Sequence, residues 1–185
     1  MSWRSGSCRS RAPISLAWLS RSSSQRNQRG SRAQGCVGGL LDLLYDPGRV
    51  RVGKLHEPDR CSPGDVATLS DAALGDDVFE RVLEVRDKPV TPSDLSAILH
   101  KVAALRIRKV GVVAIHRGQD KLDEAEARAE ATEGGVSVER FTSWELLVRM
   151  IVFWARESEL AAVEKAAERI RVRLQRSGPN RTKDS

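Results

Sequence analysis

Residues 78–90, VFERVLEVRDKPV, decide the expected fold because they read as a strand that gathers charge on one face. Successive side chains of a strand point to opposite faces, so Glu84, Arg86 and Lys88 should share one face while apolar residues take the other. A carboxylate beside cations is costly to bury, and such a group usually serves chemistry or a specific partner. A salt-bridged edge strand is the simpler interpretation, and the surrounding sequence decides between the two.

Short strands are expected before this stretch, over residues 49–52 and 65–69, because apolar residues alternate or cluster there between turn signals. The polar segment 70–77 should turn the second strand back into the central one, which gives a hairpin or meander. A short helix is expected over residues 38–45, ended by the Asp46-Pro47-Gly48 turn.

A helix should follow the central strand, because Thr91 can cap it and Pro92 suits its first position. Apolar residues then recur at helical spacing, at Leu95, Ile98, Leu99, Val102 and Leu105. Residues 109–115, KVGVVAI, read as a strand covered on both faces. Strand, helix and strand form a βαβ unit, so the strand at 109 should run parallel to the one at 78.

The rest of the chain predicts a helix over 121–132, a strand over 136–141, a helix capped by Ser143 and a final helix over 157–176. The capped helix should bury Leu147, Met150, Ile151 and Trp154. The fold class is therefore α/β, with a mixed central sheet flanked by helices. We divide the chain into a disordered leader, residues 1–35, a core, residues 36–156, and a C-terminal helix and tail, residues 157–185.

Charge is unevenly distributed along the chain. Residues 1–41 contain seven arginines and no acid, so the remaining 24 of the 31 Lys and Arg residues stand against 25 acids and leave the rest at −1. Basicity therefore belongs to the leader and is no evidence for DNA binding by the fold. The leader resembles an organelle transit peptide, and an artefactual upstream extension of the reading frame explains it equally well.

The three cysteines are scattered, without a C-x-x-C pair, and the chain has three histidines. A zinc site or a disulfide framework is therefore not expected, and a reducing compartment such as the cytoplasm is the default. No apolar run approaches the roughly 20 residues of a membrane helix, so we expect no membrane partner.

Asp65 opens the second expected strand, and Glu84 lies in the third. If the two strands are antiparallel neighbours, both carboxylates can converge on one ion. Two acidic oxygens with water and phosphate oxygens suit Mg²⁺, which keeps part of its water shell. Asp77 is a fallback ligand if the register slips by one residue. Asp42 and Glu57 are further candidate acids, although an exposed charge is the simpler interpretation of each.

The motif Pro63-Gly64-Asp65 followed by EVRDK, residues 84–88, resembles that of the PD-(D/E)XK nuclease superfamily. The longer sequence around this motif, SPGDV and then EVRDKPVTPSDL, is similar to that of SacI-type restriction endonucleases. The resemblance covers roughly residues 38–154 and implies a restriction-endonuclease-like fold, with Asp65 and Glu84 as ligands of Mg²⁺. The superfamily's usual lysine falls on Arg86, which cannot act as a base because it stays protonated; Lys88 is the candidate to replace it.

What the resemblance implies is a type II restriction endonuclease that hydrolyses double-stranded DNA at a specific sequence, as a homodimer. We keep two alternatives. One is a truncated, inactive remnant that binds DNA, and the other is an unrelated small α/β binding domain in which Glu84 and Arg86 form only an ion pair. His116, at the end of a buried strand, could touch a substrate, but a capping role is the simpler expectation.

Overall fold

The computed structural model describes residues 26–53, 63–71, 78–119 and 124–176. Its centre is a five-stranded sheet in the order β1-β2-β3-β4-β5, so every strand lies beside its neighbour in sequence. The strands are β1 (Val50–Val52), β2 (Val66–Leu69), β3 (Phe79–Arg86), β4 (Lys109–Ala114) and β5 (Ser137–Phe141). The first three are antiparallel, whereas β3, β4 and β5 run parallel. The expected mixed sheet, with its meander and its βαβ unit, is confirmed.

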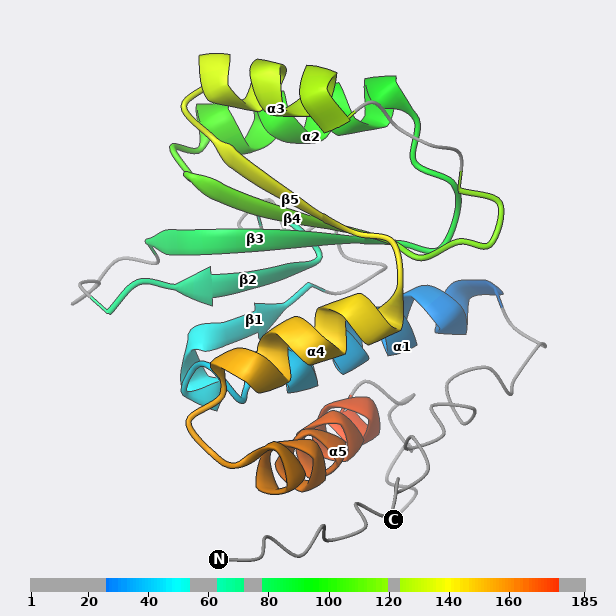
Figure 1. The fold of residues 1–185 in the computed structure, drawn as a ribbon, viewed down its shortest axis with the longest axis vertical. Coiled ribbons are helices and arrows are strands. Elements are labelled where there is room, and N and C mark those ends of the chain that lie inside the picture. Colours follow the sequence, from blue (N-terminus) through cyan, green and yellow to red (C-terminus); the bar gives the residue numbers. More distant parts are fainter. Residues whose placement is uncertain (1–25, 54–62, 72–77, 120–123, 177–185) are drawn as a thin grey trace, which may run out of the picture.

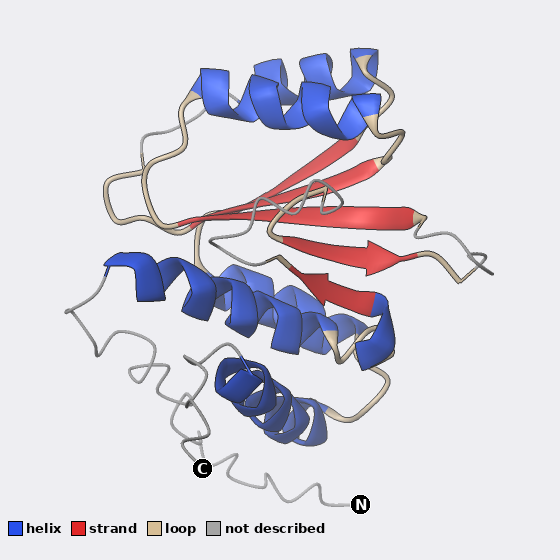
Figure 2. Ribbon diagram, turned by 180° about the vertical axis from the view of Figure 1, so that it is seen from behind, coloured by secondary structure: helices blue, strands red, loops and turns tan. Residues whose placement is uncertain are grey.

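Helices cover both faces of the sheet (Figures 1 and 2). On one face lie α2 (Pro92–Ala104) and α3 (Glu124–Glu133), and on the other lie α1 (Arg26–Leu41) and α4 (Trp144–Trp154). The last helix, α5 (Glu159–Arg176), packs on α1 away from the sheet. Each face has its own apolar core, and β3 contributes to both: Val82 packs on the α2 side and Leu83 and Val85 on the α1 side.

Local signals set several helix ends. Thr91 caps α2 in a capping box with Asp94, and Ser143 caps α4 by accepting a 3.1 Å hydrogen bond from the Leu146 N–H. Both caps were expected from the sequence. In α4, Leu147 and Ile151 are fully buried as predicted, but Trp154 is 67% exposed, so its expected core position was wrong.

Helix α1 begins ten residues earlier than the expected core boundary at residue 36. Residues 26–35, which we expected to be disordered, are helical in the structure. The segment is polar and contains two glycines, so local propensity does not favour a helix there. Packing against α5 supports the helix: a Cβ on Gly35, within the segment, would lie 3.1 Å from Cδ2 of Leu174, and a Cβ on Gly39, one turn on, would lie 2.6 Å from the backbone of Ile170.

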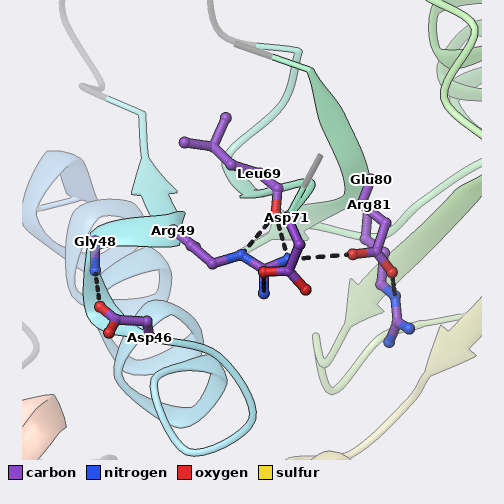
Figure 3. A network of polar contacts seen from close by, with 7 residues as sticks. All are labelled: Asp46, Gly48, Arg49, Leu69, Asp71, Glu80 and Arg81. Carbon is purple, nitrogen blue, oxygen red and sulfur yellow. Dashed lines mark hydrogen bonds and ion pairs between the residues drawn. The ribbon is translucent and has the colours of Figure 1, made fainter. Parts of the chain in front are cut away.

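Arg49 links the edge strand β1 to its neighbours through several polar contacts (Figure 3). The Nε and Nη2 of Arg49 donate to the Leu69 carbonyl oxygen at 3.0 and 2.6 Å. Its other contacts are ion pairs with Asp71 and Glu80, at 2.5 and 3.5 Å, and the ring of Tyr45 at 5.3 Å. This network joins the residue before β1 to the last residue of β2 and to the start of β3. It therefore helps to hold the register in which Asp65 and Glu84 meet.

Candidate functional site

Asp65 and Glu84 meet where β2 begins beside β3. The pairs Val66 with Leu83 and Ala67 with Val82 fix the register, and continuing it by one residue places Asp65 opposite Glu84. The structure therefore brings the two predicted metal ligands together on neighbouring antiparallel strands, as their spacing suggested.

The Asp65 carboxylate is held by two hydrogen bonds. Its Oδ2 accepts from the backbone N–H of Val85 at 2.7 Å, and its Oδ1 accepts from Nε2 of Gln34 at 2.7 Å. A carboxylate offers about four acceptor positions, so both oxygens keep capacity for another partner. The side chain is consequently fixed in place without being saturated.

Gly64 allows the chain to pass closely over Glu84. A Cβ at this position would lie 2.4 Å from Cγ1 of Val82 and 3.1 Å from Oε1 of Glu84. Any larger residue would push the segment before β2 away from β3. The glycine of the Pro63-Gly64-Asp65 motif therefore has a steric role in closing the distance between the two carboxylates.

Glu84 is a buried carboxylate, only 5% exposed, with cations on both sides. The Nζ of Lys101 lies 3.5 Å from Oε1, and the Nη2 of Arg86 lies 3.5 Å from Oε2. Burial raises the pKa of Glu84, and the neighbouring Asp65 carboxylate raises it further, whereas Lys101 and Arg86 act in the opposite direction. Burial and Asp65 outweigh the two cations, so the ionised form of Glu84 is disfavoured in the absence of a further positive charge, and a bound divalent cation would favour it.

Arg86 and Lys88 differ in their positions. Arg86 ends β3 with its side chain 33% exposed beside Glu84, and its Nε is buried without a hydrogen-bond partner in the described part of the chain. Lys88 lies in the bend beyond β3 and is exposed. The expectation that β3 continues to residue 90 and carries Lys88 on the same face was wrong, because pairing with β4 ends at Ala114, opposite Arg86.

Two residues of the site were missed by sequence reasoning. Lys101 comes from α2, three residues after the buried Ile98, so it borders the apolar face of that helix. This position was a usable signal, because a lysine there can extend toward the sheet. Gln34 comes from α1, within a segment that we assigned to the leader, and no pattern in the sequence indicated it.

Of the other candidate acids, Asp42 is the one that the structure describes, and it does not join the site. Asp42 is buried in a two-bond ion pair with Arg173, with hydrogen bonds of 2.8 and 2.6 Å, which is a structural role. Glu57 and Asp77 lie outside the described residues. His116 is exposed, and its Nδ1 accepts from the N–H of Gly118 at 3.0 Å, as expected of a capping histidine.

The donor set fits a hard divalent cation better than a soft one. Within the described ranges, no three His, Cys, Asp or Glu side chains gather into a metal site, so an ion here would be held by two carboxylates and completed by other oxygens. Besides the carboxylates, the buried Oε1 of Gln34 is an acceptor without a partner among these residues. Carboxylate, amide and water oxygens are the ligands that Mg²⁺ prefers.

No protein-family model matches the chain, and no curated protein matches it in sequence. In the part of the chain that the structure describes, none of the helices has the length and apolar character needed to cross a membrane.

Proposed function

We propose that the chain is a magnesium-dependent endonuclease of the type II restriction class, which hydrolyses phosphodiester bonds of double-stranded DNA. The observation that carries the proposal is the meeting of Asp65 and Glu84 across β2 and β3, with Lys101 and Arg86 within 3.5 Å of the Glu84 carboxylate. Two acids with adjacent cations are the groups that metal-assisted phosphoryl chemistry requires. DNA as the substrate, action as a homodimer and a cytoplasmic location rest on the resemblance to SacI-type enzymes.

Asp65 and Glu84 would hold the magnesium ion. The chemistry that magnesium supplies when bound is activation of water and neutralisation of charge on the phosphate. Asp65 is already oriented by the Val85 N–H and by Gln34, so it needs little rearrangement to bind. Glu84 is held out of water, where its charge acts more strongly than it would at the surface.

The two cations have different capabilities. Arg86 stays protonated, so it can clamp a phosphate oxygen but cannot accept a proton from water. Its buried, unpartnered Nε is a donor suited to such an oxygen. Lys101 reaches the site from α2. We assign to it the role of the lysine that PD-(D/E)XK nucleases usually carry on the central strand.

A DNA-binding protein without activity is the second candidate, and one observation favours it. Both cations near Glu84 also neutralise it, which is the arrangement of a structural ion-pair network, and an arginine stands where the resembled family carries its lysine. In this case the fold would bind DNA but would not cleave it.

Plasmid cleavage by the full chain tests the proposal. We expect discrete fragments with Mg²⁺, none with a chelator, and none from Asp65→Asn or Glu84→Gln. The exposed acid Glu145, on α4, provides the matched control, and Glu145→Gln should cleave as the wild type does. Folded protein that binds DNA without cutting it would support the second candidate, and protein that neither binds nor cuts DNA would contradict both.

A further inference from the structure

Gln34 is a buried amide whose two polar atoms have unequal surroundings. It is 4% exposed, and its Nε2 donates to Asp65 Oδ1 at 2.7 Å. Its Oε1 is buried and has no hydrogen-bond partner among the described residues. A buried acceptor without a partner is destabilising, because it has lost its hydrogen bonds to water and gained none in the protein. If the amide were turned around, its oxygen would face the Asp65 carboxylate oxygen. The hydrogen bond to Asp65 therefore fixes Nε2 as the bonded atom and Oε1 as the atom without a partner.

We propose that Gln34 supplies a third protein oxygen to the divalent-cation site of Asp65 and Glu84. The inference deepens the proposed function and rests on its pair of metal ligands. An amide oxygen is a hard ligand of the same kind as a carboxylate, and it favours Mg²⁺ or Mn²⁺ over softer ions. The cation is the partner that the buried Oε1 lacks.

Glutamine suits this position better than an acid does. Without the ion, its Nε2 holds the Asp65 carboxylate, whereas a glutamate would repel it. With the ion, its oxygen adds a ligand and no charge, so the two charges of the cation are balanced by Asp65 and Glu84 alone. The side chain also connects the helical layer of α1 to the start of β2, and the site therefore depends on a helix that begins at Arg26.

Binding of Mn²⁺ to the full chain, without DNA, tests the inference. Electron paramagnetic resonance of free Mn²⁺ gives the affinity, and thermal melts with and without Mn²⁺ give the shift in melting temperature. Gln34→Leu should weaken binding by about tenfold or more, in the range found when groups around a metal are lost. Gln34→Glu keeps an oxygen but loses the donor to Asp65. It should be less stable than the wild type without Mn²⁺, bind Mn²⁺ at least as tightly, and show a larger rise in melting temperature.

A role limited to orienting Asp65 gives a different result, in which Gln34→Glu loses affinity as much as Gln34→Leu. That result would overturn the inference. Gln119, a half-buried amide that bonds the backbone of Val90, provides the control, and Gln119→Leu should keep the wild-type affinity.

Cleavage assays on the same proteins separate this inference from the proposed function. Tight Mn²⁺ binding that depends on Gln34, without DNA cleavage, would contradict the nuclease and support the metal site. Cleavage by the wild type, with equal Mn²⁺ affinity in the wild type, Gln34→Leu and Gln34→Glu, would overturn the inference alone. A wild type that binds no Mn²⁺ would contradict both.

Discussion

The Nζ of Lys101 lies 3.5 Å from Oε1 of Glu84, so a cation from helix α2 reaches a carboxylate buried in the central sheet. The two residues are 17 positions apart and belong to different layers of the fold. Because Lys101 lowers the pKa of Glu84 against the effects of burial and of Asp65, it favours the ionised form that metal binding requires.

Removal of Lys101 should therefore change the pH dependence of cleavage. Lys101→Met should cleave more slowly because the site loses its lysine, and since the pKa of Glu84 should rise further, the acidic limb of the residual kcat/KM profile should move to higher pH. Lys101→Arg keeps the charge and should move the limb less. The exposed Lys109, at the start of β4, is the matched control, and Lys109→Met should leave the profile unchanged. An unaltered acidic limb in Lys101→Met would contradict this role.

Glu84 should also make stability depend on pH. Its pKa is raised in the folded protein above the ordinary value of 4.5, so the folded state binds the proton more tightly than the unfolded state does. This contribution is fully present below the unfolded pKa and is lost as the pH rises through the folded one.

Chelator-treated wild type should thus lose stability as the pH rises above about 4.5, relative to Glu84→Gln, which has no proton to lose at this position. At pH 7 the variant should be the more stable protein without metal, and Mg²⁺ should reduce the difference by stabilising only the wild type. Urea unfolding of both proteins across this pH range measures the effect. Parallel pH profiles for the two proteins would refute it.

The buried pair of Arg173 and Asp42 should be important for holding α5 on α1. Their side chains are 14% and 3% exposed, and Arg173→Met would leave the Asp42 charge buried without its partner. Loss of one member of such a pair costs about 3–5 kcal/mol. The exposed pair of Arg171 and Glu168 is the control, and Arg171→Met should cost less than about 1 kcal/mol. Chemical denaturation measures both, and equal losses would argue against the buried pair.

The close contact between α1 and α5 predicts that two glycines of α1 differ in how much stability is lost when each is replaced by alanine. Gly39→Ala would place a Cβ against the backbone of Ile170, which cannot move aside alone, and should cost about 1–3 kcal/mol. Gly35→Ala would meet only the flexible end of Leu174 at 3.1 Å. Because alanine also favours the helix, Gly35→Ala should be neutral or stabilising in a thermal melt. A larger loss at Gly35 than at Gly39 would contradict this packing.

Local patterns predicted most of the fold. The alternation in β3, the continuous apolar run of β4 and the caps at Thr91 and Ser143 each act over a few residues, so the sequence alone reveals them. Antiparallel pairing of β2 with β3 was expected from the turn between them, but alternation does not fix which residues lie opposite each other, so the meeting of Asp65 and Glu84 was expected only on condition of that pairing, and the register shows it.

Tertiary contacts determined what the sequence could not predict. Residues 26–35 form a helix because α5 packs against α1, although their composition is polar. Lys88 lies in an exposed bend and not on the strand, because the pairing of β3 with β4 ends at Arg86, which no local pattern marks. Gln34 and Lys101 reach the site from opposite layers, and only the folded chain brings them to the two acids.

The most direct test of the account is whether Asp65 and Glu84 act on one metal ion. Single-turnover DNA cleavage with Mg²⁺ should be measured for the wild type, Asp65→Asn, Glu84→Gln and the double variant. If both carboxylates serve the same ion, each single variant should fall to the background of the double variant, because residues that act as a unit are not additive. Wild-type cleavage by either single variant, or losses that simply add in the double variant, would contradict it.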